Sequence, residues 1–452
     1  MDLRIRTAKG LLLLVASTPL LAQEREAEPA SGHNDGSPRI RFDGSYRLRY
    51  ESLNNSFRHG NDDQLAVSRL LAHLRYTGDH WFAGGELQDS RAWKGDRETP
   101  LGTDDINVLT PLQYYLGWRG TWRSGDLEVK AGRLTADLGS RRLLARNRFR
   151  NTLNNFEGVG IQWQPAHEHP GYWQAFWYNP IQRNPVDRPA LAENDYGVDR
   201  ALRGTRIWGL YRETEALVLY ALRLDESDQP NVATRDRELT TLGFFSRKAA
   251  IPDTWGYELE AAWQFGYSRS GTSPDASRLL HRAGFAHGEW RYQFNDALRS
   301  QLRLQLDYAS GDRSEADDEN NRFDTLYGAR RFDFGPTGIW GAFARTNIVS
   351  PGVRWQFQSG HWIPEATVQG LVGYRAIWRA STADGQSTAG ISADNGARFV
   401  GHQWEVRLQA PLTESVESEI GGAYLARGAA LKDASGETVP ATYLYCQVTL
   451  KF

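Results

Sequence analysis

The sequence contains very little cysteine and lysine. Cys446 is the single cysteine among 452 residues, so an internal disulfide and every multi-cysteine metal site are excluded. Only six lysines accompany 47 arginines. Planar guanidinium groups bind carboxylates in a bidentate manner, so this excess of arginine suits the recognition of acidic ligands. Genome composition accounts for the excess equally well.

Beyond the N-terminus the sequence also lacks any apolar run near the roughly 18 residues that a membrane-crossing helix needs, which excludes a helical membrane protein. Mean hydropathy is -0.58, and 53 basic residues nearly balance 55 acidic ones. A net charge of -2 favours neither nucleic acid nor a membrane surface as a partner, and we expect no nucleic-acid partner. Aromatic residues make up 12% of the chain, too many for a disordered protein.

The first 22 residues have the pattern of a secretory signal. Arg4, Arg6 and Lys9 form a basic region, residues 11–21 form an apolar one, and Leu20-Leu21-Ala22 is an acceptable cleavage site. We therefore expect a signal peptide over residues 1–22, a disordered N-terminal tail over 23–37 and a folded domain over 38–452.

Alternation with a period of two dominates the chain after Pro38. In the first run, Ile40, Phe42 and Leu48 are apolar, whereas Arg47 and Arg49 are charged. The same pattern recurs over 255–267, 298–308 and 404–409. Strands with one apolar and one ionic face, and with aromatic residues near their ends, are typical of outer-membrane barrels. A soluble barrel with its charged face outward is the alternative.

The links between these runs alternate between short and long. Short links occur at 77–79, 123–125 and 413–415, whereas 52–64 and 89–111 are long and polar. Outer-membrane barrels alternate short periplasmic turns with long extracellular loops in this way. The sequence therefore predicts an all-β fold, a transmembrane antiparallel β-barrel of about 18 strands in the Gram-negative outer membrane.

The chain ends on an apolar strand face that closes with Phe452. This ending resembles the assembly signal of outer-membrane barrels, so we expect the barrel assembly machinery to be a partner through Phe452. Outer-membrane lipid is the second expected partner.

Alternation places the charged face of the first strands inside the barrel. Arg41, Arg47 and Arg49 of the first run, with Arg69 and Arg75 of the second, then face the lumen. A barrel of this size leaves an aqueous channel, in which guanidinium groups favour an anionic solute and bind it weakly at many sites. Pairing of these arginines with lumenal carboxylates is the alternative.

Several motifs resemble those of the alginate export family. Gly132-Arg133, Gly139-Ser140-Arg141-Arg142-Leu143 and Phe156-Glu157-Gly158-Val159 are similar to its strand-end, loop and strand-start patterns. Tyr308-Ala309-Ser310-Gly311-Asp312 and Phe323-Asp324-Thr325-Leu326-Tyr327 are similar to segments around its largest external loop. With residues 47–51, the resemblance covers essentially the whole exported chain.

The resemblance implies an outer-membrane channel that exports an alginate-like anionic polysaccharide, a polyuronate, through an arginine-lined pore, with periplasmic polymer-secretion proteins as further partners. By motif it implies Arg47, Arg49, Arg133 and Arg142 as substrate contacts, and Asp312 and Asp324 as acids that order a loop. Alternation alone adds the remaining expected pore-lining residues, Arg41, Arg69, Arg75, Arg354 and Arg407.

Arg133 is a special case, because Val129 and Ala131 are expected to face lipid and the same parity turns Arg133 outward. A bulge or the strand end must therefore redirect it.

Two other classes of function compete with polymer export. An anion-selective porin for uptake of small acidic solutes or oligosaccharides is the alternative channel. An outer-membrane hydrolase would need grouped residues such as His59, Ser90 and His402, but nothing in the sequence couples them. We therefore expect no enzyme and no catalytic residue.

Metal ligands are sparse. His167-Glu168-His169 lies in an expected periplasmic turn, and we assign no metal there. The acidic segment from Asp312 to Asp324 offers oxygen ligands of the type that Ca²⁺ takes, without the spacing of an EF-hand. Calcium on this segment is our only cofactor expectation.

Overall fold

The computed structural model describes residues 39–58, 60–96, 99, 101–166, 171–314, 316–363, 366–384, 396–431 and 439–452. The expected signal peptide (1–22) and tail (23–37) lie outside these residues and remain predictions. Within the described part of the chain, no helix is both long enough and apolar enough to span a bilayer.

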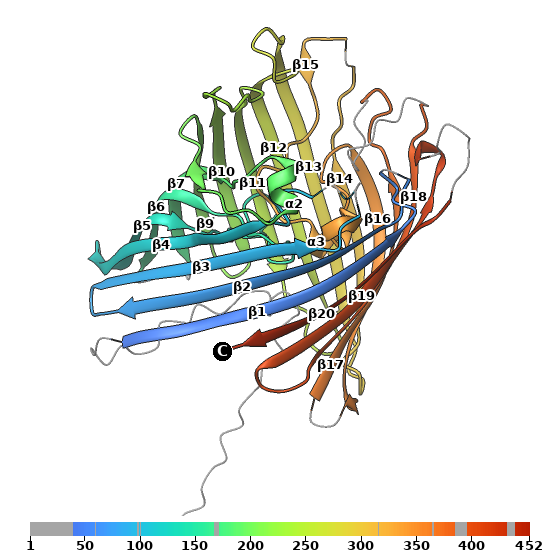
Figure 1. The fold of residues 1–452 in the computed structure, drawn as a ribbon, viewed down its shortest axis with the longest axis horizontal. Helices are drawn as coiled ribbons and strands as arrows, with labels where there is room; N and C mark the ends of the chain where they lie inside the picture. The colour runs from blue at the N-terminus through green and yellow to red at the C-terminus, as the bar shows by residue number, and fades with distance from the viewer. Residues whose placement is uncertain are drawn as a thin grey trace, which may run out of the picture. The chain divides into compact units, whose positions relative to one another are not determined.

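Eighteen long strands of the described residues form one closed antiparallel β-barrel (Figure 1). Each strand pairs with the next along the ring, and β1 pairs with β20 from Ser45 opposite Lys451 to Asn54 opposite Thr442. The predicted fold class is confirmed. In ring order the strands are β1 (Arg39–Asn54), β2 (Asp63–Thr77), β3 (Trp81–Trp93), β4 (Asn107–Trp122), β5 (Gly125–Leu134), β6 (Phe156–Pro165), β7 (Tyr172–Gln182), β9 (Thr205–Glu213), β10 (Leu217–Glu226), β11 (Glu238–Lys248), β12 (Thr254–Arg269), β13 (Arg278–Gln293), β14 (Gln301–Ala309), β16 (Ile348–Ile363), β17 (Ala366–Trp378), β18 (Phe399–Pro411), β19 (Val416–Arg427) and β20 (Ala441–Lys451).

Short elements lie in the loops between these strands. They are β8 (Arg200–Ala201), β15 (Glu319–Asn320), α2 (Arg188–Ala192), α3 (Arg331–Phe334) and the 3-10 turns η1 (Gly338–Trp340) and η2 (Ala429–Leu431).

The barrel wall has an apolar outer face and a polar inner face. On β1, Ile40 is 76% exposed and Leu48 is 49% exposed, whereas Arg47 and Arg49 on either side of Leu48 are buried. Successive side chains of a strand point to opposite faces, so this exposure follows directly from the alternation in the sequence. Exposed tryptophans and tyrosines continue the apolar face around the ring. Such a surface suits hydrocarbon outside and charged groups inside.

Two long loops fold into the barrel and contact each other. We call residues 135–155, between β5 and β6, loop A, and residues 310–347, between β14 and β16, loop B. Leu144 of loop A forms a parallel bridge with Tyr327 of loop B, and the amide of Ala329 donates to the carbonyl of Arg141. Leu144, Phe334 and Trp340 of these loops are fully buried. The hydrophobic core therefore lies inside the ring, between the two loops and the wall.

Candidate solute pathway

Loop A is held against the inner wall by arginines of β1 and β2. Arg49 donates to the carbonyl oxygen of Phe149 at 2.7 Å, and Arg47 donates to that of Arg150 at 2.9 Å. Arg69, which lies opposite Arg47 in the ladder, donates to the carbonyls of Arg148 and Arg150 at 2.8 and 2.9 Å. Three guanidinium groups therefore bind the backbone of one short segment, and Arg49 also pairs with the buried carboxylate of Glu51 at 2.7 Å.

Loop B is held by ion pairs with loop A and with the wall. Arg142 of loop A binds the carboxylate of Asp333 in α3 through two hydrogen bonds of 2.9 Å, and it also donates to Glu260 on β12 at 3.0 Å. From β16, Arg354 donates to the backbone oxygen of Asp333 at 2.6 Å and lies 3.5 Å from Glu405. Arg142 thus joins both loops to the barrel.

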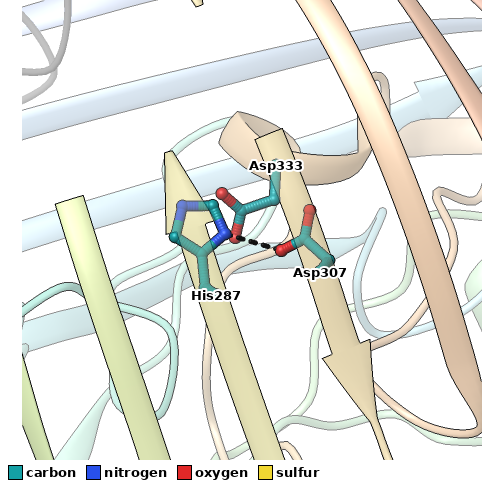
Figure 2. A group of neighbouring side chains, drawn as sticks. All are labelled: His287, Asp307 and Asp333. Atoms are coloured by element: carbon teal, nitrogen blue, oxygen red, sulfur yellow. Dashed lines mark hydrogen bonds and ion pairs between the residues drawn. The ribbon is translucent and has the colours of Figure 1, made fainter. Parts of the chain in front are cut away.

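Figure 2 shows three neighbouring side chains at this junction, His287 on β13, Asp307 on β14 and Asp333 on loop B. The Nδ1 atom of His287 lies 2.7 Å from Oδ1 of Asp307, and all three residues are buried. Arg375 donates to Asp307 at 2.9 Å, while Arg142 neutralises Asp333. Guanidinium groups already bind both carboxylates, so the positive charge opposes a cation here. Arg375 also donates to the backbone oxygen of Asp333 at 2.8 Å and so ties loop B to the wall.

The structure brings five of the nine predicted pore residues together around loops A and B. These are Arg47, Arg49, Arg69, Arg142 and Arg354, all buried. Their guanidinium groups bind loop carbonyls or carboxylates. A role in contacting solute stays a prediction for them.

Two further predicted residues lie at the turn end of the barrel. Arg75 lies 3.0 Å and Arg41 3.4 Å from the carboxylate of Asp43, and 64% of the Arg41 side chain is exposed. Arg407 shares the inner face of β18 with Glu405, and no ion pair or hydrogen bond of its side chain occurs within the described part of the chain. Pore lining remains a prediction for these three arginines as well.

Arg133 lies near the loop end of β5, opposite Tyr114 of β4, and the strand register runs through Gly132 without the bulge that was expected. Gly132 has φ +136°, and a Cβ atom there would lie 2.2 Å from the carbonyl oxygen of Tyr114. Only glycine adopts this conformation readily. Arg133 is buried, lies 3.9 Å from Glu157 and donates to the backbone of Asp199 in the loop after β7. Its contacts are therefore with the rim of the barrel, away from loop B.

Sequence reasoning missed a basic cluster at the loop end of the barrel. Two cavities of about 420 and 320 Å³ share Arg150 and Arg330 in their linings. Arg58 lines the larger cavity and Arg183 the smaller one. Asp104 accepts from Arg150 at 2.8 Å and from Arg183 at 2.7 Å. These residues lie in loops without periodicity, so no pattern in the sequence indicated that they meet.

Electrostatics in this cluster favour an added negative charge. Burial and the neighbouring charges of Arg150 and Arg58 lower the pKa of Arg330 to about 9. Burial also lowers the pKa of Arg58. The pKa of Asp104 is lowered despite its burial, because the charges of Arg150 and Arg183 favour the carboxylate. Asp62, Asp63 and Asp105 also line the larger cavity, but Arg330 lies close enough to Arg58 and Arg150 that an anionic ligand would relieve their repulsion.

The acidic segment of loop B engages mainly amides and arginines. Asp312 accepts from the amides of Arg313 and Asn321 at 3.0 and 3.2 Å, and Asp324 accepts from the amide of Leu326 at 2.8 Å. Glu319 binds Arg282 at 2.9 Å. Asp312 and Asp324 thus have the contacts expected of acids that order a loop. Calcium on this segment stays a prediction.

Residues considered for other chemistry are not assembled into a site. Ser90 donates to the carbonyl of Asn151 inside the barrel at 2.7 Å, while His402 contacts Tyr374 at 2.7 Å on the outer side. His59 and His167-Glu168-His169 lie outside the described residues.

An apolar-coated ring of eighteen strands with two loops folded into its bore defines an outer-membrane β-barrel of the porin type. A family model described as alginate export matches residues 39–444. The chain therefore belongs to the alginate export family, as its motifs predicted, and to the Gram-negative outer membrane. None of the curated proteins matches it.

Solved structures of outer-membrane porins share the fold. OpdK of Pseudomonas aeruginosa, solved with vanillate, is 14% identical with a TM-score of 0.54, covering 91% of this chain and 99% of OpdK. A BenF-like porin from Pseudomonas fluorescens Pf-5 is 9% identical with a TM-score of 0.56, covering 92% and 99%. OccAB1 of Acinetobacter baumannii is 11% identical with a TM-score of 0.55, covering 91% and 97%. The family and the fold are those of channel proteins.

Proposed function

We propose that the protein is a channel that passes an alginate-like polyuronate through the outer membrane in the direction of export. The observation that carries the proposal is the arginine cluster at the loop end, where Arg58, Arg150, Arg183 and Arg330 line two adjoining cavities and two of them pair with Asp104. Membership of the alginate export family supports the polymer class.

The wall arginines suggest how a polyuronate would pass loop A. Arg47, Arg49 and Arg69 donate to neutral carbonyl oxygens of residues 148–150. Hydrogen bonds from guanidinium to a carboxylate are roughly twice as strong as neutral ones. A uronate carboxylate would therefore compete with the loop backbone for the same donors. Its binding must remain weak at each site so that the polymer moves on.

Conductance through single channels tests the proposal. We expect oligouronates to block the current, and the double variant Arg150→Gln, Arg330→Gln to require at least about tenfold more oligouronate for the same block, because charge-assisted contacts are lost. Arg313→Gln, an exposed arginine of loop B, is the matched control and should behave as wild type. Unchanged block in the double variant would contradict the assignment of these residues. A neutral oligosaccharide should not block any of the proteins.

A porin for uptake of small acidic solutes is the second candidate. OpdK, which shares this fold, was solved with vanillate, a monocarboxylate. Cavities of about 320 and 420 Å³ are also of the size that holds a small molecule. A deletion strain that still secretes polymer but grows poorly on an acidic oligosaccharide would favour uptake. Loss of secretion with normal growth would favour export.

A further inference from the structure

The outer surface of β9 to β13 carries a charged patch at the loop end of the barrel. We call it the outer-leaflet patch. It consists of Arg206, Arg223, Arg278 and Arg282 with Asp225, Glu238 and Glu319.

Strand register places these side chains outside the barrel. In the row nearest the loops, Arg206 lies opposite Asp225, and Asp225 lies opposite Glu238. In the next outward-facing row, Arg223 lies opposite Trp208, which is 40% exposed. Directly opposite residues of antiparallel strands share a face, so the charged residues point away from the bore.

The patch marks the upper edge of the apolar band. One row further toward the turns, Ala221 lies between Leu210 and Leu242, which are 45% and 46% exposed. The outer face therefore changes from charged to apolar within two rows of side chains. Long loops of outer-membrane barrels are extracellular, so the patch lies at the head groups of the outer leaflet.

The guanidinium groups of the patch are fixed but still accessible. Arg282 pairs with Glu319 at 2.9 Å and Arg278 with Glu238 at 3.2 Å, yet 55% and 59% of their side chains are exposed. Arg278 lies over the Tyr267 ring at 4.0 Å, which orients it further. A guanidinium has five N–H donors, and these ion pairs leave several of them for another ligand.

The remaining two arginines, on β9 and β10, extend the same surface. Arg223 pairs with Asp225 at 2.6 Å, and Arg206 lies over the Trp177 ring at 5.9 Å. Four cations and three anions thus line one interfacial surface that has aromatic rings within it. Arginine on aromatic and apolar rows can contact a phosphate while acyl chains cover the rows below.

We propose that the outer-leaflet patch binds the phosphate groups of the phosphorylated glycolipid in the outer leaflet. The guanidinium groups take the phosphates in a bidentate manner, and the rows around Leu210 and Leu242 take the acyl chains. The inference depends on the outer-membrane location alone. It stands whether the channel exports a polymer or takes up small solutes.

Lipid titration of the purified barrel in detergent, followed by native mass spectrometry, tests the proposal. The probes are bisphosphorylated lipid A, its dephosphorylated form and phosphatidylglycerol. We expect the quadruple variant Arg206→Gln, Arg223→Gln, Arg278→Gln, Arg282→Gln to bind bisphosphorylated lipid A at least about tenfold more weakly than wild type. Wild type should bind the dephosphorylated form with a similarly reduced affinity. This comparison needs no variant.

Arg91→Gln is the matched control, because Arg91 pairs with Asp89 on β3 and 39% of its side chain is exposed. It should bind lipid A as wild type does, and the quadruple variant should keep its conductance because its substitutions lie outside the bore. Equal affinity of wild type and the quadruple variant would overturn the proposal, as would an equal loss in Arg91→Gln. Phosphatidylglycerol binding as tightly as lipid A would overturn the assignment to the glycolipid.

Discussion

Arginine side chains in this barrel bind backbone carbonyls as well as carboxylates. Arg49 donates to Phe149, and Arg69 donates to the carbonyls on either side of it. A carbonyl accepts such a bond without neutralising the donor. The charge of Arg49 is nevertheless paired with Glu51 at 2.7 Å, and that of Arg142 with Asp333 and Glu260, whereas Arg47 donates to the uncharged oxygens of residues 148–151. Arginines of the wall and loops therefore differ in how readily they can bind an anionic solute.

The first prediction concerns the anchors of loop A. Replacing Arg47 and Arg49 together with Gln removes charged donors from the carbonyls of 149–150, and hydrogen bonds to charged groups contribute about 1.5–3 kcal/mol each. We expect trypsin to cleave at Arg148 and Arg150 at least about tenfold faster, because loop A opens more often. Trypsin should cleave the variant Arg41→Gln, whose substitution lies at the turn end, at the wild-type rate. Equal rates for all three proteins would show that these arginines do not hold the loop.

Asp105 provides a pH-dependent charge in the larger cavity. Burial, followed by the negative charges of Glu51 and Asp104, raises the pKa of Asp105 to about 7. The side chain is neutral below that pH and negative above it. We expect anion block to weaken as pH rises from 6 to 8, because the cavity gains a negative charge.

The Asp105→Asn channel should be blocked by anions as strongly as wild type at pH 6, and this block should persist at pH 8. Asp104→Asn is the control. The pKa of Asp104 is lowered, so its removal should strengthen block at both pH values. A wild-type block that does not change with pH would contradict the assigned pKa of Asp105.

At the scale of elements, loops A and B form one internal unit. Backbone hydrogen bonds join them at Leu144 and Tyr327, and the ion pair of Arg142 with Asp333 closes the contact. Asp333 lies beside His287 and Asp307 of β13 and β14 (Figure 2), and Arg375 of β17 donates to Asp307 and to the backbone oxygen of Asp333. Loops A and B therefore narrow the bore, and several separate bonds must break before they can move.

Asp333→Asn tests this coupling. The substitution removes a charge that Arg142 and Arg345 share, and breaking a buried pair in this way costs several kcal/mol. We expect faster hydrogen exchange over residues 325–345 and a larger, noisier single-channel current. Asp317→Asn, in the acidic part of loop B, should leave both measurements unchanged. If exchange stays slow in Asp333→Asn, the backbone bonds alone hold the loops.

At the scale of the whole molecule, the last residue of the chain pairs with β1 where the ring closes. The amide of Gly44 donates to the carbonyl of Phe452 at 2.8 Å, and the Phe452 amide donates back at 3.1 Å. The rings of Phe452 and Phe42 lie 5.8 Å apart on the outer face. A Cβ atom at Gly44 would lie 2.5 Å from the Phe452 ring, so glycine makes room for it.

We expect Phe452→Ala to lower the amount of folded barrel in the outer membrane several-fold, because the predicted signal for the assembly machinery is lost. Heat-modifiable mobility on gels measures the folded fraction. Phe294→Ala, an exposed aromatic near a turn, is the control and should assemble normally. Purified Phe452→Ala should refold in detergent at the wild-type rate. A slow refolding rate would instead assign the defect to closure of the ring.

The sequence by itself determined the barrel and the side on which each strand residue lies. The alternation of Ile40 and Leu48 with Arg47 and Arg49 has the period of a strand, so it sets the outer and inner faces before any partner is known. The number of strands followed from the alternation of short and long links between them. The register runs through Gly132 without a shift, so Arg133 lies opposite the exposed Tyr114, at the rim of the barrel.

Only the tertiary structure decided what the inner residues touch. Arg142 and Asp333 are 191 positions apart, and the carbonyls that bind Arg47 and Arg69 have no side-chain signature. Loops A and B have no periodicity, so their path into the bore follows from burial of Leu144, Phe334 and Trp340 against the wall. Strand faces are encoded locally, whereas loop contacts depend on packing between residues far apart in the sequence.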